Sequence, residues 1–274
     1  MVEVDLKTLQ NIELEILDEF VRICEKHHLK YFLMAGTALG AIRHHGFIPW
    51  DDDIDVGMPR EDYEKLIKIA SSDLRSDYFF QNYHSEKNCG LIFGKIRKSN
   101  TILSENYSHH IDMHQGVWID IFPYDNIGLE PKVSKIDSAL IMILKNIYIV
   151  KCGYKMPENR SKYLLPFYYL TKMIAVFFSY KFLITKLDHL MKKRNTQASK
   201  YVYPRGSGYG SRDIMSKEVI ENLIEVDFEG RKLKIFKEYD HYLTSIYGDY
   251  MQLPPVDKRR NTSCHFLHEF KSKI

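Results

Sequence analysis

The 274-residue chain is long enough to bury a core without disulfides or structural metal ions. Hydrophobic residues make up 45% of it and charged residues 27%, which excludes a disordered or fibrous protein. The formal net charge is only +3, yet residues 132–200 hold 14 basic and 3 acidic residues, a local charge of +11. The remaining chain then holds 25 basic and 33 acidic residues, a charge of −8. We therefore expect an acidic body with a basic middle.

The sequence shows no targeting signal. Its first residues lack the basic and apolar regions of a signal peptide, so we expect a cytoplasmic location. The most apolar stretch, residues 164–184, contains Lys172 and Lys181, and its longest apolar run is too short to cross a bilayer. The four cysteines are widely spaced, which favours neither a disulfide framework nor a zinc site.

Periodicity predicts helices and strands in alternation. The first half is expected to form helices at 6–26, 38–45 and 61–70 and strands at 31–34, 50–58, 78–82, 91–98 and 117–122. In the first helix, an apolar stripe is expected from residues that recur at intervals of three or four: Leu9, Ile12, Ile16, Phe20 and Ile23. In the second half we expect a helix at 133–150, one long or two shorter helices over 163–194, a hairpin at 226–235 and a helix at 239–247. Thr37 is the expected N-cap of the second helix.

The most informative segment is the acidic strand predicted at 50–58. Because side chains alternate along a strand, Asp51, Asp53 and Asp55 are expected on one face, and Asp52, Ile54 and Val56 on the other. Three like charges on one face repel one another unless a cation neutralises them. Carboxylate oxygens select hard ions, so the segment indicates a site for Mg²⁺, Mn²⁺ or Ca²⁺.

Two other interpretations of this segment compete. A run of charges is often a solvated turn, but the apolar neighbours Trp50, Ile54 and Val56 argue against that here. An EF-hand loop would match the first three ligand positions. That motif needs glycine at its sixth position, where this chain has Val56, and glutamate at its twelfth, where it has Asp62.

A candidate phosphate-binding turn lies upstream of the acidic strand. Gly36 allows backbone amides to approach an anion closely, and the Thr37 hydroxyl can add a hydrogen bond. Arg43 follows two helical turns later, where a guanidinium could clamp a phosphate. The structural alternative is a simple helix cap. A Walker A motif is missing, so a P-loop kinase is not expected.

An apolar-Gly-Thr turn followed by Asp-apolar-Asp resembles the nucleotidyltransferase-fold superfamily. The resemblance predicts a third carboxylate on a neighbouring strand, and Asp120 in the apolar run 117–122 supplies one. The alternative for Asp120 is a structural aspartate that accepts backbone hydrogen bonds. The resemblance implies an α/β (α+β) fold, a mixed sheet flanked by helices, with the basic region as an additional helical part.

Residues 36–55, GTALGAIRHHGFIPWDDDID, resemble the signature of the LicD family. That family includes bacterial phosphocholine transferases and is related to fukutin and fukutin-related protein. Shorter pieces at 94–101, 116–123, 228–230 and 247–255 also match, so the resemblance covers about residues 6–127 and 205–265. We expect a catalytic core at 1–130, a basic helical region at 131–202 and a C-terminal segment, 203–274, that completes the core.

The LicD resemblance implies a cytosolic, Mg²⁺-dependent phosphotransferase, with Mn²⁺ as the alternative ion. The expected donor is a CDP-linked alcohol, first of all CDP-choline. The expected acceptor is a sugar hydroxyl of a glycan or lipid-linked glycan, such as a teichoic acid or lipopolysaccharide precursor. By the same resemblance Asp53, Asp55 and Asp120 are the catalytic and metal-binding residues.

Further residues are expected to bind the substrate. Gly36, Thr37 and Arg43 would contact the donor phosphates, and Lys95 and Arg97, which alternate along one strand, can face the same cleft. A choline headgroup calls for an aromatic cage through cation–π attraction, assisted by the charge of Asp51 or Asp52. Its aromatic candidates are Phe47, Trp50, Tyr83, Trp118 and Tyr209. For each of these the alternative is an ordinary core or surface position.

Two other functions remain open at this point. A true nucleotidyltransferase would release pyrophosphate instead of CMP, and a non-catalytic protein on the same fold would bind metal or glycan only. The basic middle also has two interpretations: helices that rest on the anionic inner face of a membrane, or helices that cover the catalytic core. No recognition motif supports a nucleic-acid partner, although the charge would suit one.

Overall fold

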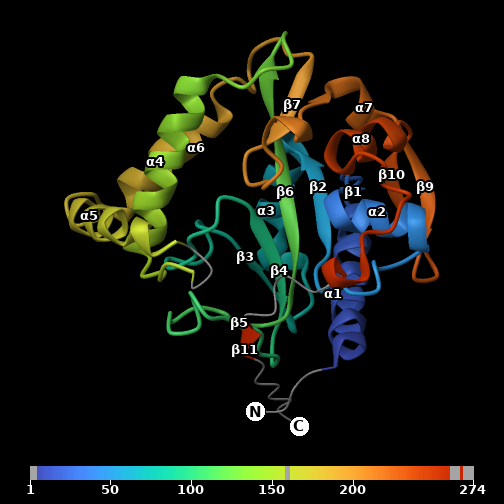
Figure 1. Ribbon diagram of the computed structural model, residues 1–274, viewed down its shortest axis with the longest axis horizontal. Helices are drawn as coiled ribbons and strands as arrows, with labels where there is room; N and C mark the ends of the chain where they lie inside the picture. Colours follow the sequence, from blue (N-terminus) through green and yellow to red (C-terminus); the bar gives the residue numbers. More distant parts are fainter. Residues whose placement is uncertain (1–4, 158–160, 260–265, 268–274) are drawn as a thin grey trace.

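The protein folds around a curled, mixed seven-stranded sheet (Figure 1). The computed structural model describes residues 5–157, 161–259 and 266–267. The main path of the sheet runs β1 (Phe32–Leu33), β2 (Asp55–Pro59), β6 (Trp118–Gly128), β4 (Gly94–Lys98), β3 (Tyr78–Gln81). β2 and β6 are parallel, whereas β1 pairs with β2, β4 with β6, and β3 with β4 in the antiparallel sense. The predicted mixed α/β fold is confirmed.

The long central strand β6 has two partners on the side away from β2. Its first part pairs with β4, and its second part pairs with β7 (Tyr201–Pro204), which continues to β8 (Met215–Ser216). β9 (Leu223–Phe228) and β10 (Arg231–Phe236) form a separate hairpin. Glu229 and Gly230 turn it with φ angles of +47° and +75°, as a two-residue hairpin loop requires, and this confirms the predicted hairpin. The short strands β5 (Ser104–Glu105) and β11 (Phe266–Leu267) pair with each other.

Helices pack on the sheet through the predicted apolar stripes. α1 (Leu6–Lys26) buries every residue of its expected stripe: Leu9, Ile12, Ile16, Phe20 and Ile23. The other helices near the sheet are α2 (Ala35–His44), α3 (Arg60–Asp73), α7 (Lys217–Glu221) and α8 (Tyr239–Tyr247). Short 3-10 turns occur at η1 (Lys162–Leu164), η2 (Gly210–Asp213) and η3 (Val256–Lys258).

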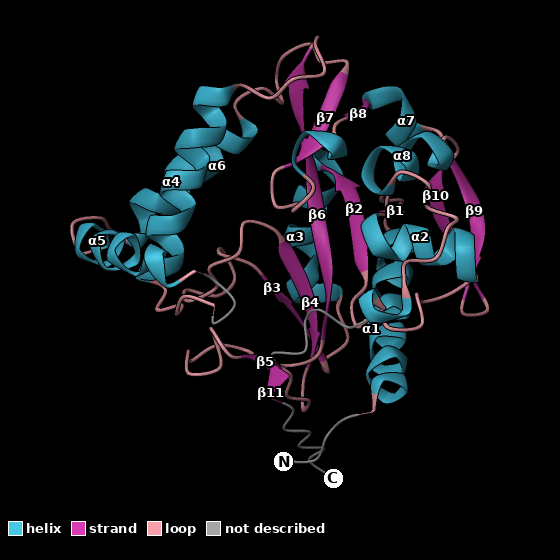
Figure 2. Ribbon diagram, in the orientation of Figure 1, coloured by secondary structure: helices cyan, strands magenta, loops and turns pink. Residues whose placement is uncertain are grey.

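The basic middle of the chain forms an all-helical group beside the sheet (Figure 2). It consists of α4 (Lys135–Lys151), α5 (Leu165–Ala175) and α6 (Tyr180–Lys192), and α5 lies at its outermost end. No single described helix is both long and apolar enough to cross a bilayer. α5 and α6 meet those criteria only as a pair, and they are bent by 110° at their junction.

Two predicted boundaries near the acidic segment are wrong. The strand expected at 50–58 begins only at Asp55, because the Asp51 amide donates to the Ile48 carbonyl at 2.9 Å and closes a turn. The helix expected at 38–45 already begins at Ala35, so Thr37 lies in its first turn and does not cap it. Of the two expectations for 163–194, two shorter helices are found. The division into parts at residues 130 and 202 remains a prediction.

Candidate active site

The parallel pairing of β2 with β6 places two of the predicted carboxylates side by side. Asp55 is the register partner of Asp120, and the Asp120 amide donates to the Ile54 carbonyl at 2.8 Å. Register partners on neighbouring strands point to the same face of the sheet. Both carboxylates therefore face one side at the start of β2.

Lys95 supplies a positive charge on the other flank of Asp120. It is the register partner of Asp120 on β4, and its Nζ lies 2.8 Å from Asp120 Oδ1. The Lys95 ammonium also lies 4.0 Å from the centroid of the Trp118 ring. A row of two aspartates and one lysine thus crosses the neighbouring strands β2, β6 and β4. The ion pair with Lys95 holds one Asp120 oxygen on the β4 side.

The tightest acidic group in the described part of the chain is Asp51, Asp52 and Asp53. One carboxylate oxygen from each of the three residues can be chosen so that the three atoms lie within 4.8 Å of one another. This differs from the predicted grouping of Asp53, Asp55 and Asp120, and it corrects the expectation that Asp52 points away from its neighbours. The reason is the turn that precedes β2: residues 51–54 are not in a strand, so their side chains do not alternate.

Burial and mutual repulsion affect the pKa values of these carboxylates. Burial raises the pKa of Asp53 well above its ordinary value, and the charges of Asp51 and Asp120 raise it further. Burial, followed by the charges of Asp53 and Asp120, has the same effect on the pKa of Asp55. Burial raises the pKa of Asp51 to about 7. The pKa of Asp120 is also raised by burial, although Lys95 opposes that shift.

A sixth acidic residue at this site, Glu13, was missed by sequence reasoning. Glu13 lies on α1, is only 1% exposed, and its Oε2 has no hydrogen-bond partner among the described residues. Burial raises its pKa well above the ordinary value, and the nearby charge of Asp53 adds to the shift. One turn before it, the buried Gln10 donates from Nε2 to the Asp51 carbonyl at 2.9 Å. A glutamate within the apolar stripe of a helix was the available signal.

The beginning of α2 faces the acidic turn. A Cβ added to Gly36 would lie 2.8 Å from Asp51 Oδ2, so the missing side chain lets that carboxylate approach the helix. The Thr37 hydroxyl accepts a hydrogen bond from the Asp55 amide at 2.8 Å, which ties the helix to the first residue of β2. The free amides and positive end of a helix dipole favour anions at this place.

Two predicted substrate-binding groups, Arg43 and Arg97, are engaged elsewhere. Arg43 lies near the far end of α2, where it donates to the Tyr250 carbonyl at 2.7 Å and to His44 at 2.9 Å. Arg97 is 2% exposed and donates to the Gly116 carbonyl at 2.6 Å. Their roles towards a substrate therefore remain predictions.

The aromatic candidates separate into those at the site and those away from it. Burial raises the pKa of Tyr209 to about 12, and the nearby charges of Asp55, Asp53 and Asp51 also contribute to this shift, so Tyr209 lies close to the acidic group. Its hydroxyl lies 2.6 Å from that of Tyr247, a residue that sequence reasoning did not select. Trp50 is half-buried beside His44, with ring centroids 6.4 Å apart.

The remaining candidates lie in other surroundings. Tyr83 bonds to Asp188 on α6 and belongs to a second apolar cluster with residues of α4 and α6. Phe47 is buried against Phe228 of the hairpin, with centroids 5.2 Å apart. Trp118 is buried beneath Lys95 and Arg97.

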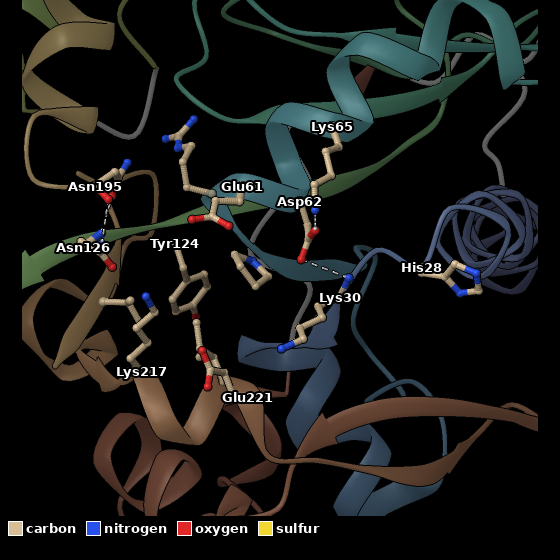
Figure 3. Close-up of a pocket in the computed structure, with 14 residues that line it drawn as sticks. His28, Lys30, Glu61, Asp62, Lys65, Tyr124, Asn126, Asn195, Lys217 and Glu221 are labelled. Atoms are coloured by element: carbon tan, nitrogen blue, oxygen red, sulfur yellow. Dashed lines mark hydrogen bonds and ion pairs between the residues drawn. The ribbon is translucent and has the colours of Figure 1, made fainter. Parts of the chain in front are cut away.

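A separate cleft of about 300 Å³ lies at the other end of β2, near Pro59 (Figure 3). Four residues along a strand span about 13 Å, which separates this cleft from Asp55. Its lining contains none of the predicted site residues, and its charges partly neutralise one another, as where Lys65 pairs with Asp62 at 2.8 Å. The acidic turn is therefore the better candidate for the active site.

Comparison with known proteins agrees with this choice. Residues 28–137 match the family described as LicD/FKTN/FKRP, nucleotidyltransferase domain, and this range includes every predicted site residue except Tyr209. The lipopolysaccharide cholinephosphotransferase LicD of Haemophilus influenzae is 30% identical over 277 residues, which cover 95% of this chain and 96% of that protein. The chain belongs to the LicD family.

More distant LicD relatives match shorter segments. An uncharacterised protein of Rickettsia prowazekii is 31% identical over 106 residues, 35% of this chain and 40% of that protein. Mouse ribitol 5-phosphate transferase FKRP is 30% identical over 93 residues, 34% of this chain and 18% of that protein. The named LicD relatives are transferases, and we assign this chain to the phosphotransferases.

The residues of the site fit a hard divalent cation. The donor set consists of carboxylate oxygens, which such ions prefer, and it contains neither cysteine nor histidine. Glu13 adds a buried carboxylate oxygen without a partner among the described residues. Buried like charges are stable together only when a positive charge compensates them, and Lys95 supplies one such charge.

Proposed function

We propose that this protein transfers phosphocholine from CDP-choline to a sugar hydroxyl of a cell-surface glycan precursor, in the cytoplasm and with Mg²⁺ or Mn²⁺. The observation that carries the proposal is the register of Asp55 with Asp120, next to the acidic turn at Asp51–Asp53. The cholinephosphotransferase with which the chain aligns over almost its full length supports the choice of donor and of a lipopolysaccharide-like acceptor. A teichoic acid precursor is the alternative acceptor.

Transfer at phosphorus depends on positioning and on neutralising charge. Asp53, Asp55 and Asp120 would hold the divalent cation, which when bound neutralises the donor pyrophosphate. Lys95 favours the ionised form of Asp120 through their ion pair, and an ionised Asp120 can share the cation or accept the proton of the attacking hydroxyl. The new bond joins the sugar oxygen to the phosphorus that carries choline, and the bond to CMP breaks.

The choline end of the donor requires a cation-binding surface. Trp50, Tyr209 and Tyr247 lie around the acidic group and offer aromatic faces. A ribitol donor has no positive charge and would need hydrogen bonds instead. FKRP is named for ribitol 5-phosphate, so CDP-ribitol is the second candidate donor.

The test is a product assay with the purified full-length protein. We would supply CDP-choline, CDP-ribitol or CDP-glycerol with Mg²⁺ and a saccharide acceptor, and measure CMP and pyrophosphate separately. We expect CMP and a choline-phosphate-modified sugar, with CDP-choline as the best donor. Release of pyrophosphate would instead identify a nucleotidyltransferase, and the absence of turnover with all donors would leave a binding protein.

A further inference from the structure

α5 is a helix whose apolar side chains face outwards. Ala175 is its only buried residue, whereas a surface helix normally turns an apolar stripe towards the core. The loop after α5 continues this surface, and Phe177 in that loop is 83% exposed. We call the exposed apolar residues here the α5 corner: Tyr163, Phe167, Tyr169, Leu170, Met173, Val176 and Phe177.

Hydrogen bonds on the inner side hold α5 in this orientation. The Tyr168 hydroxyl donates to the Tyr154 carbonyl at 3.1 Å, and Lys151 Nζ donates to the Ala175 carbonyl at 3.0 Å. The Tyr180 hydroxyl in turn donates to the Lys151 carbonyl at 2.9 Å. The helix is thus fastened to its neighbours while its apolar surface remains available to a partner.

The charge around the α5 corner has one sign. Residues 161–187 contain four lysines and no acidic residue. Lys172 and Lys181 are exposed, and Lys186 Nζ lies 5.9 Å from the centroid of the Phe182 ring. Aromatic and aliphatic side chains flanked by lysines are typical of segments that lie in the interface of an anionic membrane.

Crossing the bilayer does not suit this corner. The eleven residues of α5 measure about 16 Å as a helix, against a hydrocarbon core of about 30 Å. α6 packs against the rest of the protein, because its residues Leu183, Leu187 and Met191 are buried in the protein's second apolar cluster. α5 can therefore only lie along a membrane surface.

We propose that the α5 corner docks the protein onto an anionic lipid bilayer. Its apolar side chains enter the interface, and its lysines lie against the lipid headgroups. Docking would keep the enzyme at the surface where lipid-linked acceptors are found, which goes beyond the transfer reaction itself.

Sedimentation of the full-length protein with sucrose-loaded vesicles tests this proposal. Vesicles of phosphatidylcholine are compared with vesicles that contain about one third phosphatidylglycerol, and we expect binding about tenfold stronger to the anionic vesicles and weaker as salt is raised. The variant M173S/V176S should bind the anionic vesicles about tenfold less. The matched control is M251S/V256S, because it changes the same residue types at similar exposure. Met173 and Met251 are 60% and 56% exposed, and Val176 and Val256 are both 75% exposed. This control should bind like the wild type.

Three results would overturn the proposal. The first is no preference for anionic vesicles, and the second is an equal loss of vesicle binding in both variants. The third is a protein that does not bind vesicles but forms a dimer, with the dimer lost in M173S/V176S and kept in M251S/V256S. The last result would make the corner a contact between two copies of the chain. CMP release from CDP-choline with a soluble acceptor, measured in parallel, should be unchanged in M173S/V176S. Failure of the docking proposal is thereby separated from failure of the proposed function.

Discussion

The acidic turn and the α5 corner depart in opposite ways from the usual distribution of side chains. At the acidic turn, carboxylates are withdrawn from water, and Glu13 Oε2 has no hydrogen-bond partner among the described residues. At the α5 corner, large apolar side chains are left in water. Each arrangement costs free energy in the isolated protein, and each would be stabilised by a partner from outside the chain. Where a fold tolerates such a cost, the departure itself indicates a binding surface.

The largest effect is expected at Asp53. Asp53→Asn removes a charge from the centre of the acidic group, and we expect transfer to fall about a thousandfold or more. The metal-free variant should unfold at the same or a higher temperature, since a like-charge repulsion is lost. CMP release and thermal unfolding would be measured beside Asp227→Asn, a control on the hairpin where Asp227 is exposed and pairs with Lys232. Wild-type turnover in Asp53→Asn would refute the assignment.

Glu13 is expected to have the next largest effect. Glu13→Gln keeps the shape of the side chain but removes a buried carboxyl group near the aspartates that could ionise when a cation binds, and we expect divalent-cation affinity to fall about 10- to 100-fold. Glu15→Gln is the matched control, because Glu15 lies on the same helix and is exposed. Equal cation affinity in the two variants would make Glu13 a purely structural residue.

A smaller effect on turnover is expected when the missing side chain at Gly36 is filled. In Gly36→Ala the new methyl group would meet the Asp51 carboxylate, whose flexible end can move aside at little cost in stability. We expect turnover to fall about tenfold, because displaced groups at a reacting centre lose alignment. Gly208→Ala, where nothing lies within 4 Å, should behave like the wild type. A large drop in the unfolding temperature of Gly36→Ala would contradict this account.

The acidic turn also predicts how stability depends on pH. The Asp51 carboxyl titrates near 4 when unfolded and at about 7 in the fold, so between these values the native state holds more protons than the unfolded state. The free energy of unfolding of the metal-free protein should therefore fall as pH rises through that range. Added Mg²⁺ should raise the unfolding temperature by a few degrees more at pH 8 than at pH 5. An increase of the same size at both pH values would contradict the prediction.

The smallest effect on stability is expected at the α5 corner. M173S/V176S changes side chains that make little contact with the core, so the free energy of unfolding should stay within about 0.5 kcal/mol of the wild type. Urea unfolding would measure it. A loss of several kcal/mol would mean that the corner packs against the protein after all.

Local sequence patterns predicted the helices and strands, whereas long-range packing determined which residues meet at the acidic site. The apolar stripe of α1 and the hairpin turn at Glu229 and Gly230 follow from neighbouring residues, and both were predicted from the sequence. The pairing of Asp55 with Asp120 depends on the register of strands 65 residues apart, which no local pattern fixes. The family resemblance, and not the periodicity, selected Asp120.

The errors have physical causes of the same kind. Consecutive aspartates are poor strand formers, and the Asp51 turn replaces the expected alternation of side chains. Tyr247 reaches the site through α8, nearly two hundred residues after the acidic turn. The sequence left open whether helices of the basic middle face a membrane, and it could not assign the outward face to α5, because the composition of α5 is that of a buried helix.

The central claim is that the carboxylates around β2 and β6 bind a divalent cation. Titration of Mn²⁺ followed by electron paramagnetic resonance tests it directly, without donor or acceptor. We expect saturable binding to the wild type and to Asp227→Asn, and affinity at least about tenfold lower in Asp53→Asn and Asp120→Asn. Wild-type protein that leaves Mn²⁺ free in solution, or variants that bind it as tightly as the wild type, would contradict the claim.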